Sequence, residues 1–95
     1  MIFDWDNANR EHLTRHGVSP EEAEQFFEHD PYELDTETHE EDGLRTKLIG
    51  ETDSGRILLL LVTSRGDSFR VITAWDAPQK AKKSYLLRRL HDYGY

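Results

Sequence analysis

Two histidines stand four residues apart in the stretch HLTRHG, residues 12–17, shortly after an asparagine at position 9. On a helix, Asn9, His12 and His16 follow spacings of three and four, so they share one face. Imidazole changes charge near neutral pH, and His12 and His16 are therefore candidates for moving protons in a reaction. Two other interpretations stay open: His16, beside Gly17, caps the helix, or both histidines pack as polar side chains. The interpretation of the pair as a zinc site is weaker, because neither an HExxH motif nor an obvious third ligand accompanies it.

A second group of candidates is cationic. The 95-residue chain has a net charge of −7, but residues 1–43 hold 14 acids and two arginines, whereas residues 44–95 hold ten Lys or Arg and five acids. The second half could therefore present a face that attracts phosphate groups. The candidates for substrate binding on that face are Lys47, Arg56, Arg65, Arg70 and Arg88. For Arg56 and Arg70 the alternative is a cross-strand ion pair with Glu51 or Asp67.

The composition restricts what can position these residues. A chain of 95 residues with 36% hydrophobic content fits one domain, residues 1–95, with a modest core. The longest apolar run, ILLLLV at 57–62, is too short to cross a bilayer, and the chain starts without a charged and then apolar leader. We therefore expect a soluble cytoplasmic protein. The sequence has no cysteine, which excludes disulfides, thiolate metal sites and cysteine nucleophiles.

Helix signals occur in three places. After a short strand in MIFDWD, Asp6 or Asn7 is placed to cap a helix over 7–16 that ends at Gly17. Ser19, Pro20 and Glu22 form a capping box that predicts a helix over 20–28. Asp76 and Pro78 open a third helix. Its inward side chains are predicted to be Leu86, Leu87, Leu90 and Tyr93, with the lysines and arginines outward.

Period-two patterns predict strands over 44–52, 55–64 and 68–76, joined by short turns. The segment 32–43 is acidic and almost without apolar residues, so it predicts an exposed loop. His39 lies among its carboxylates, yet no ligand spacing of a cation site is present. The resulting order is β-α-α-β-β-β-α, and the fold class is α+β with helices packed on one antiparallel sheet.

Several motifs carry a resemblance to a known family. WDNANREHLTRHGVSPEEAEQFF, residues 5–27, resembles the opening of the BrnT toxins, which start with Trp-Asp, a helix ending in Arg/Lys-His-Gly-Val, and a second helix starting Pro/Phe-Glu-Glu. LIGETDSGRILLLLV, residues 48–62, is similar to the Ile-Gly and Gly-Arg-x-Leu strand pair of that family. FRVITAWDAPQKAKKSY, residues 69–85, is similar to its Arg-x-Ile-Ser/Thr-Ala segment and its Tyr-bearing last helix.

The resemblance implies a RelE-like fold and the toxin role in a bacterial type II toxin-antitoxin system. It implies a ribonuclease that needs no metal or other cofactor, inhibits translation, and is silenced by a small DNA-binding antitoxin encoded nearby. RNA would be cleaved by attack of a ribose 2′-hydroxyl on the adjacent phosphate, which needs a base, an acid and cations around the phosphorane. The alternative is a non-enzymatic module of the same fold that only binds such a DNA-binding partner.

The resemblance also ranks the site residues. Arg56 and Arg70 match family arginines, which makes them the preferred phosphate holders. Tyr85 matches the family tyrosine and could donate a proton or stack on a base, although helix packing explains it equally well. The catalytic set is therefore His12, His16, Arg70 and Tyr85. Many relatives carry arginine where this chain has Trp75, which can stack on a base but cannot neutralise a phosphate.

Overall fold

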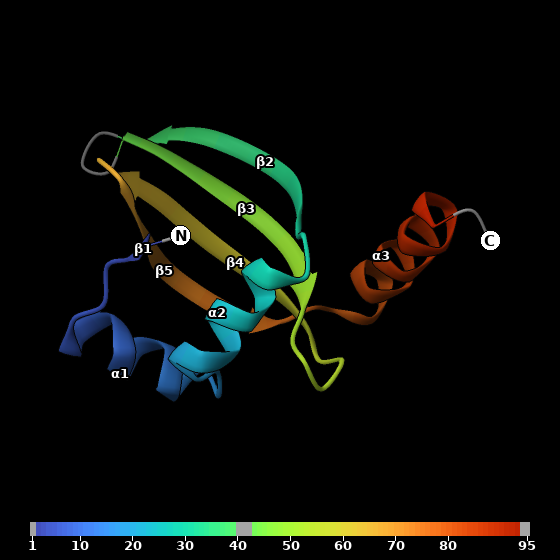
Figure 1. The fold of residues 1–95 in the computed structure, drawn as a ribbon, viewed down its shortest axis with the longest axis horizontal. Coiled ribbons are helices and arrows are strands. Elements are labelled where there is room, and N and C mark those ends of the chain that lie inside the picture. The colour runs from blue at the N-terminus through green and yellow to red at the C-terminus, as the bar shows by residue number, and fades with distance from the viewer. Residues whose placement is uncertain (1, 40–42, 94–95) are drawn as a thin grey trace.

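A computed structural model describes residues 2–39 and 43–93 of the chain, apart from the side chains of His39 and Arg65. Its elements follow the order β-α-α-β-β-β-β-α and form three helices and a five-stranded sheet of order β1-β5-β4-β3-β2 (Figure 1). The elements are β1 (Ile2–Phe3), α1 (Asn7–Arg15), α2 (Pro20–Glu28), β2 (Tyr32–His39), β3 (Gly43–Glu51), β4 (Ile57–Arg65), β5 (Ser68–Asp76) and α3 (Gln79–Asp92). The predicted α+β class is confirmed.

The predicted caps of the first two helices are present. Asp6 accepts the backbone N–H of Asn9 at 2.9 Å, and Asn9 accepts the N–H of Asp6 at 2.8 Å, which closes a capping box on α1. Gly17 follows α1 with φ of +75°, a conformation that glycine adopts without strain. Ser19 and Glu22 form the predicted box on α2. These signals lie within a few residues of each other, so local sequence determines both helix starts.

The main core lies between one face of the sheet and helices α1 and α2. Leu13 of α1 and Phe26 of α2 are fully buried against Leu58 and Leu60 of β4. Gly50 of β3 is required here, because a Cβ at this position would lie 2.9 Å from the Phe26 ring. A second cluster on the opposite face joins Tyr85 of α3 to strand residues such as Ile49, Ile57 and Leu59.

The segment predicted as an acidic loop is in fact a strand in its described part. β2 pairs antiparallel with β3 from Tyr32↔Ile49 to His39↔Gly43, with an irregularity between Glu33 and Asp35. An edge strand needs little apolar content, because backbone hydrogen bonds hold it and charged side chains discourage pairing with other chains. The prediction was wrong because it relied on hydrophobicity alone. Residues 40–42 lie outside the described part of the chain, as does the side chain of His39.

The sheet is mixed, whereas the sequence predicted an antiparallel one. β1 pairs parallel with β5 through Ile2↔Ser68 and Phe3↔Phe69. Beyond that short pairing, no described strand covers the outer edge of β5, and α1 contacts this strand instead. The pairing of β5 with β4 shifts register around Ile72, where Leu61 faces Thr73 and Val62 faces Val71. Such a bulge redirects side chains and is common beside functional sites.

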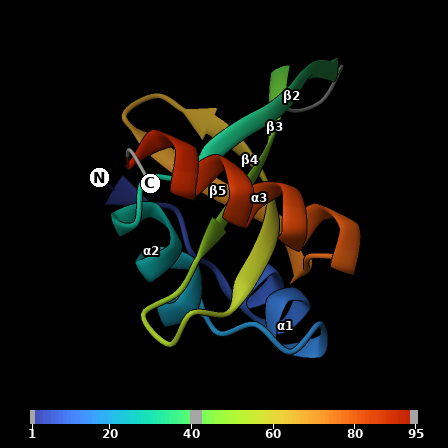
Figure 2. The same cartoon turned by 90° about the vertical axis from the view of Figure 1, so that its right-hand side faces the viewer.

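The orientation of α3 also differs from the prediction. The side chains expected to point inward, Leu86, Leu87, Leu90 and Tyr93, are all exposed. The helix follows β5 in the chain and stands apart from α1 and α2 (Figures 1 and 2). It meets the sheet through Tyr85 and Ala81, and the guanidinium groups of Arg88 and Arg89 lie over the Tyr32 ring. Polar contacts of this inner face, described below, outweigh the apolar pattern of the sequence.

Candidate active site

The open edge of β5 brings together two of the predicted catalytic residues. His12 of α1 and Arg70 of β5 line one shallow hollow of about 230 Å³, together with Asn9 and the bulged residues Val71 and Ile72. The hollow forms because the capped helix α1 lies against β5 beyond its short pairing with β1, where no other described strand covers the edge. An imidazole such as that of His12 can transfer a proton by itself, without help from a cysteine or a metal ion.

His12 is held from the strand side. Its Nε2 lies 3.0 Å from the hydroxyl Oγ1 of Thr73, a hydrogen bond whose donor depends on the imidazole tautomer. The His16 ring packs against the His12 ring with centroids 4.8 Å apart. His16 is the C-cap residue of α1, and its backbone N–H donates to the carbonyl of Leu13, so the capping interpretation fits its backbone. Thr73 and His16 therefore restrict how the His12 ring turns.

Arg70 is paired with the segment that leads into α1. Its Nη2 donates to Asp6 Oδ2 at 2.8 Å, and Nη1 lies 3.6 Å from Asp4 Oδ2. The pKa of Asp6 is lowered, first by the hydrogen bond from the Asn9 N–H and second by that from Arg70. Arg70 thus forms ion pairs, but the predicted cross-strand partners were wrong, since Asp4 and Asp6 take the place of Glu51 or Asp67. The Arg70 side chain keeps 18% exposure toward the hollow.

A second concave surface lies on the sheet face that α1 and α2 leave open. This groove of about 250 Å³ contains Trp75 and Lys47, two of the residues predicted to bind substrate. The remaining lining residues are Asp35, Glu37, Arg45 and Leu61. Leu61 is paired in register with Thr73, the residue that contacts His12. The groove and the hollow are therefore neighbours across β5.

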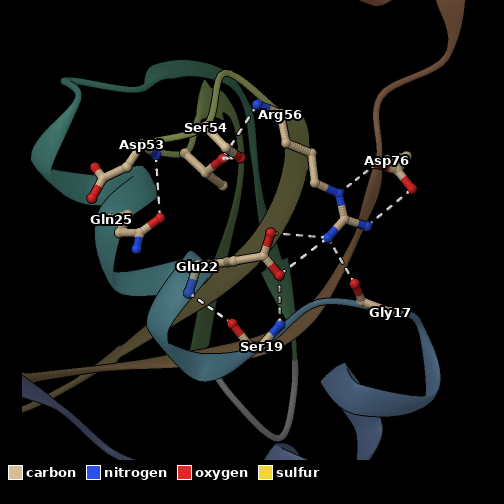
Figure 3. Close-up of polar contacts among 9 residues, drawn as sticks. Gly17, Ser19, Glu22, Gln25, Asp53, Ser54, Arg56 and Asp76 are labelled. Carbon is tan, nitrogen blue, oxygen red and sulfur yellow. Dashed lines mark hydrogen bonds and ion pairs between the residues drawn. The ribbon is translucent and has the colours of Figure 1, made fainter.

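Arg56, the other preferred phosphate holder, is instead engaged at the junction of α1, α2 and β5 (Figure 3). Its Nε and Nη2 donate to the two carboxylate oxygens of Asp76 at 2.8 and 3.1 Å. Its Nη1 donates to the Gly17 carbonyl at 2.7 Å and to both oxygens of Glu22 at 3.1 Å. The hydrogen bond to Asp76 is the largest cause that raises the pKa of Arg56. This bonding favours the structural interpretation of Arg56, with partners other than Glu51 and Asp67.

We expect Arg56→Met to lower the free energy of unfolding by about 2 kcal/mol, because hydrogen bonds to charged groups are strong and both carboxylates would lose their partner. The melting midpoint should fall by roughly 8–16 °C for a domain of this size. Arg15→Met serves as the control, since Arg15 is exposed at the end of α1. That control should change stability by less than about 0.5 kcal/mol. Equal melting of the two variants would contradict the structural role of Arg56.

The same cluster makes stability depend on pH. The hydrogen bond from Arg56 lowers the pKa of Asp76 below its ordinary value of 3.8. Burial acts to raise the pKa of Glu22, but hydrogen bonds from the Ser19 N–H and Arg56 outweigh it and lower the pKa below 4.5. The unfolded chain therefore binds more protons in acid, and this stabilisation is lost as pH falls from about 5 toward 3. The acid-induced decrease in melting temperature should be smaller for Arg56→Met than for the wild type.

Tyr85 and Arg88 do not join His12 in the hollow. Tyr85 is 2% exposed; its hydroxyl donates to Glu51 at 2.8 Å and accepts from Arg89 Nε at 2.9 Å. Burial, the largest cause, and the bond to Glu51 raise the pKa of Tyr85 to about 12. Arg88 stacks its guanidinium 3.8 Å from the centre of the Tyr32 ring. These contacts favour helix packing for Tyr85. The side chain of Arg65 lies outside the described part of the structure.

Comparison with known families now identifies the chain. The family model of the ribonuclease toxin BrnT, of type II toxin-antitoxin systems, matches residues 5–81. The chain belongs to the BrnT family. A search among curated proteins found no match. The resemblance found in the sequence is thereby confirmed, and a type II toxin-antitoxin system implies a cognate antitoxin as partner.

The BrnT match covers the hollow and the groove but ends within α3. His12, Arg70 and Trp75 lie inside it, whereas Tyr85 and Arg88 lie beyond residue 81. Among the residues that the structure describes, no helix is long and apolar enough to span a bilayer. Nor do three His, Asp or Glu side chains of that part converge to form a metal site. The relation to RelE toxins stays a prediction.

Sequence reasoning missed two residues of this region. Thr73 contacts His12 and Arg45 lines the groove, yet neither was selected. Alternation along the predicted strand 68–76 would place Thr73 on the face opposite to Arg70, since the two are three residues apart. The bulge at Ile72 instead brings Thr73 and Arg70 to the same face of the sheet, and nothing in the sequence predicts this bulge. Arg45 is two residues from Lys47 on the same strand, so both side chains point to the same face. This spacing could have suggested Arg45 from the sequence.

Proposed function

We propose that this BrnT toxin is a metal-independent endoribonuclease that cleaves RNA at the outer edge of β5 and so inhibits translation. One observation carries the proposal: His12 and Arg70, a proton-transfer group and a permanent cation, line the same hollow. The general chemistry of RNA cleavage needs these two kinds of group side by side. The proposed place of action is the cytoplasm, where messenger RNA is translated.

In the proposed mechanism, His12 removes the proton from a ribose 2′-hydroxyl. The 2′-oxygen then attacks the adjacent phosphorus while the bond to the 5′-oxygen breaks, and the leaving 5′-oxygen takes a proton from solvent water. The products are a 2′,3′-cyclic phosphate and a 5′-hydroxyl end, and His12 returns its proton to solvent. Arg70 donates N–H groups to the phosphoryl oxygens as negative charge grows on them. Thr73, whose hydroxyl contacts His12, is proposed as a positioning residue that holds the imidazole toward the hollow.

The neighbouring groove is the proposed path of the RNA strand. The half-buried Trp75 ring offers a surface on which a base can stack, and Lys47 attracts the phosphate backbone. The carboxylates of Asp35 and Glu37 in the same groove would repel phosphates, so only bases are expected next to them. Leu61 of the groove is paired with Thr73, which contacts His12 of the hollow. An RNA strand that lies in the groove would therefore need to pass only this residue pair to reach the hollow.

The purified protein should cleave RNA in the presence of EDTA, because the proposed groups are side chains of His12 and Arg70. Product ends should carry the 2′,3′-cyclic phosphate. The measurement is gel analysis of a defined RNA with and without chelator, followed by end-group analysis. Cleavage that disappears with EDTA and returns with a divalent cation would exclude this mechanism.

A non-enzymatic binding module is the second candidate. Two observations favour it: Arg70 is already neutralised by Asp6, and carboxylates share the groove with Trp75. In that case the chain would act only by binding a small DNA-binding antitoxin. Induced expression separates the candidates, since a ribonuclease toxin should arrest bacterial growth. Full growth with abundant folded protein, together with intact RNA in vitro, would support the binding module.

A further inference from the structure

The outer face of α3 carries a stripe of exposed apolar side chains. Leu86, Leu87 and Leu90 are 51%, 58% and 51% exposed, and their spacing places them on one side of the helix together with Lys83. Tyr93, at the end of the helix, is 66% exposed. Single exposed leucines are common, but a continuous stripe of them is typical of a surface that binds another protein. We call Leu86, Leu87 and Leu90 the leucine stripe.

The orientation of the leucine stripe follows from contacts on the opposite side of α3. Tyr85 is buried and donates to Glu51, and Arg89 donates to the backbone carbonyls of His29 and Asp30. The Tyr32 hydroxyl also donates to Asp92 near the end of the helix. Turning the leucines toward the sheet would break all of these bonds and leave buried polar groups without partners. The chain therefore cannot cover the stripe by rotating its own helix.

Charge indicates what kind of partner fits the leucine stripe. α3 contains five Lys or Arg and one Asp between Gln79 and Asp92. Lys80 and Lys83 are exposed beside the stripe, whereas Arg88 and Arg89 are occupied by aromatic and carbonyl contacts. A second copy of α3 laid parallel on this surface would bring lysines against lysines. A helix with acidic residues next to its apolar side chains would complement both features.

We propose that the leucine stripe is the docking surface for the cognate antitoxin, which binds through an amphipathic, acidic helix packed against α3. This inference rests on the toxin-antitoxin assignment but not on the catalytic roles of His12 and Arg70. The family match ends at residue 81, ahead of all three leucines. A contact at this surface would help the toxin to select its own antitoxin from related ones.

The test uses the triple variant Leu86→Ser/Leu87→Ser/Leu90→Ser of the full chain and the purified antitoxin encoded next to its gene. Because these side chains are more than half exposed, the melting temperature should stay close to that of the wild type. Titration calorimetry should show affinity reduced about 100-fold, since apolar anchors dominate binding energy. The control Leu34→Ser/Leu44→Ser changes leucines of similar exposure on β2 and β3, at 49% and 60%, and should bind normally.

A charge variant gives an independent measurement if the triple variant does not fold. Lys80→Glu/Lys83→Glu should weaken binding about tenfold at low ionic strength and less at high ionic strength, because salt screens exposed charges. RNA cleavage by either variant should equal that of the wild type yet resist inhibition by the antitoxin. Such a result would separate this surface from the catalytic site.

Three outcomes would overturn the inference. Wild-type affinity of the folded triple variant would show that the antitoxin docks elsewhere. If the wild type is a dimer and the triple variant is a monomer with unchanged affinity for the antitoxin, the leucine stripe binds a second copy of the chain. If the wild type binds no product of the adjacent genes, the toxin-antitoxin partnership fails and this inference fails with it, whatever the RNA assay shows.

Discussion

Replacing His12 with alanine should lower the rate of RNA cleavage at least about 100-fold, the usual effect of removing a general acid or base. His12 is the imidazole among the described residues that line the hollow, so its removal takes away the proposed base for the 2′-hydroxyl. The pH–rate profile should lose one limb in the variant. Single-turnover cleavage of a defined RNA, measured from pH 5 to pH 9, is the appropriate assay.

His16→Ala is the matched control for this prediction. His16 lies on the same face of α1 and packs against the same ring, but it is exposed at the C-cap. We expect it to reduce cleavage by no more than about tenfold and to act mainly on stability. Thr73→Val should shift the pH–rate profile without abolishing cleavage, as expected for a residue that acts through His12. Equal cleavage by wild type and a folded His12→Ala variant would refute the assignment of His12.

Arg70→Ala should reduce cleavage by roughly 100-fold, the loss of one preorganised contact to the transition-state charge. Arg70→Lys should recover only part of the activity, because an ammonium group lacks the paired N–H groups that match two phosphoryl oxygens. The ion pair with Asp6 complicates the interpretation, since Arg70→Ala also frees the segment before α1. Cleavage must therefore be compared at temperatures well below the melting midpoint of each variant.

Asp6→Asn separates the two effects of Arg70. Asparagine still accepts the Asn9 N–H and caps α1, but it no longer neutralises the guanidinium. If Arg70 acts on RNA, Asp6→Asn should cleave as well as the wild type or better. If Arg70 only anchors the β1–α1 segment, Asp6→Asn and Arg70→Ala should lose cleavage in proportion to their loss of stability. The second pattern would leave Arg70 with a purely structural role.

Local signals in the sequence were sufficient for much of the fold. The capping boxes at Asp6 and Ser19 place both helix starts, because each box joins groups only three residues apart. The strands β3 to β5 are visible as period-two segments. The family motifs also lie within short stretches, and the match over residues 5–81 confirms the family. Interactions between near neighbours survive folding largely unchanged, so they can be predicted without coordinates.

The sequence misled where contact with distant residues decides the structure. β2 has almost no apolar signal, and pairing with β3 makes it a strand. The leucines of α3 have the spacing of a core face, yet bonds from Tyr85 and Arg89 to distant groups turn them outward. In both cases backbone or polar contacts that are specific in space outweigh a hydrophobic pattern, which carries no direction of its own.

The candidate site shows the same division. Residue types and spacing identified His12 and Arg70 as candidates, and the resemblance to the BrnT toxins added Trp75 and the ribonuclease role. Only the tertiary structure brings His12 to Thr73, 61 residues away, and ties Arg70 to Asp6, 64 residues away. It also shows Arg56 bonded to Asp76, Glu22 and the Gly17 carbonyl, and places Tyr85 outside the lining of the hollow. The reason is physical: a site is assembled by the register of β5, its bulge at Ile72 and the packing of α1, none of which a linear pattern specifies.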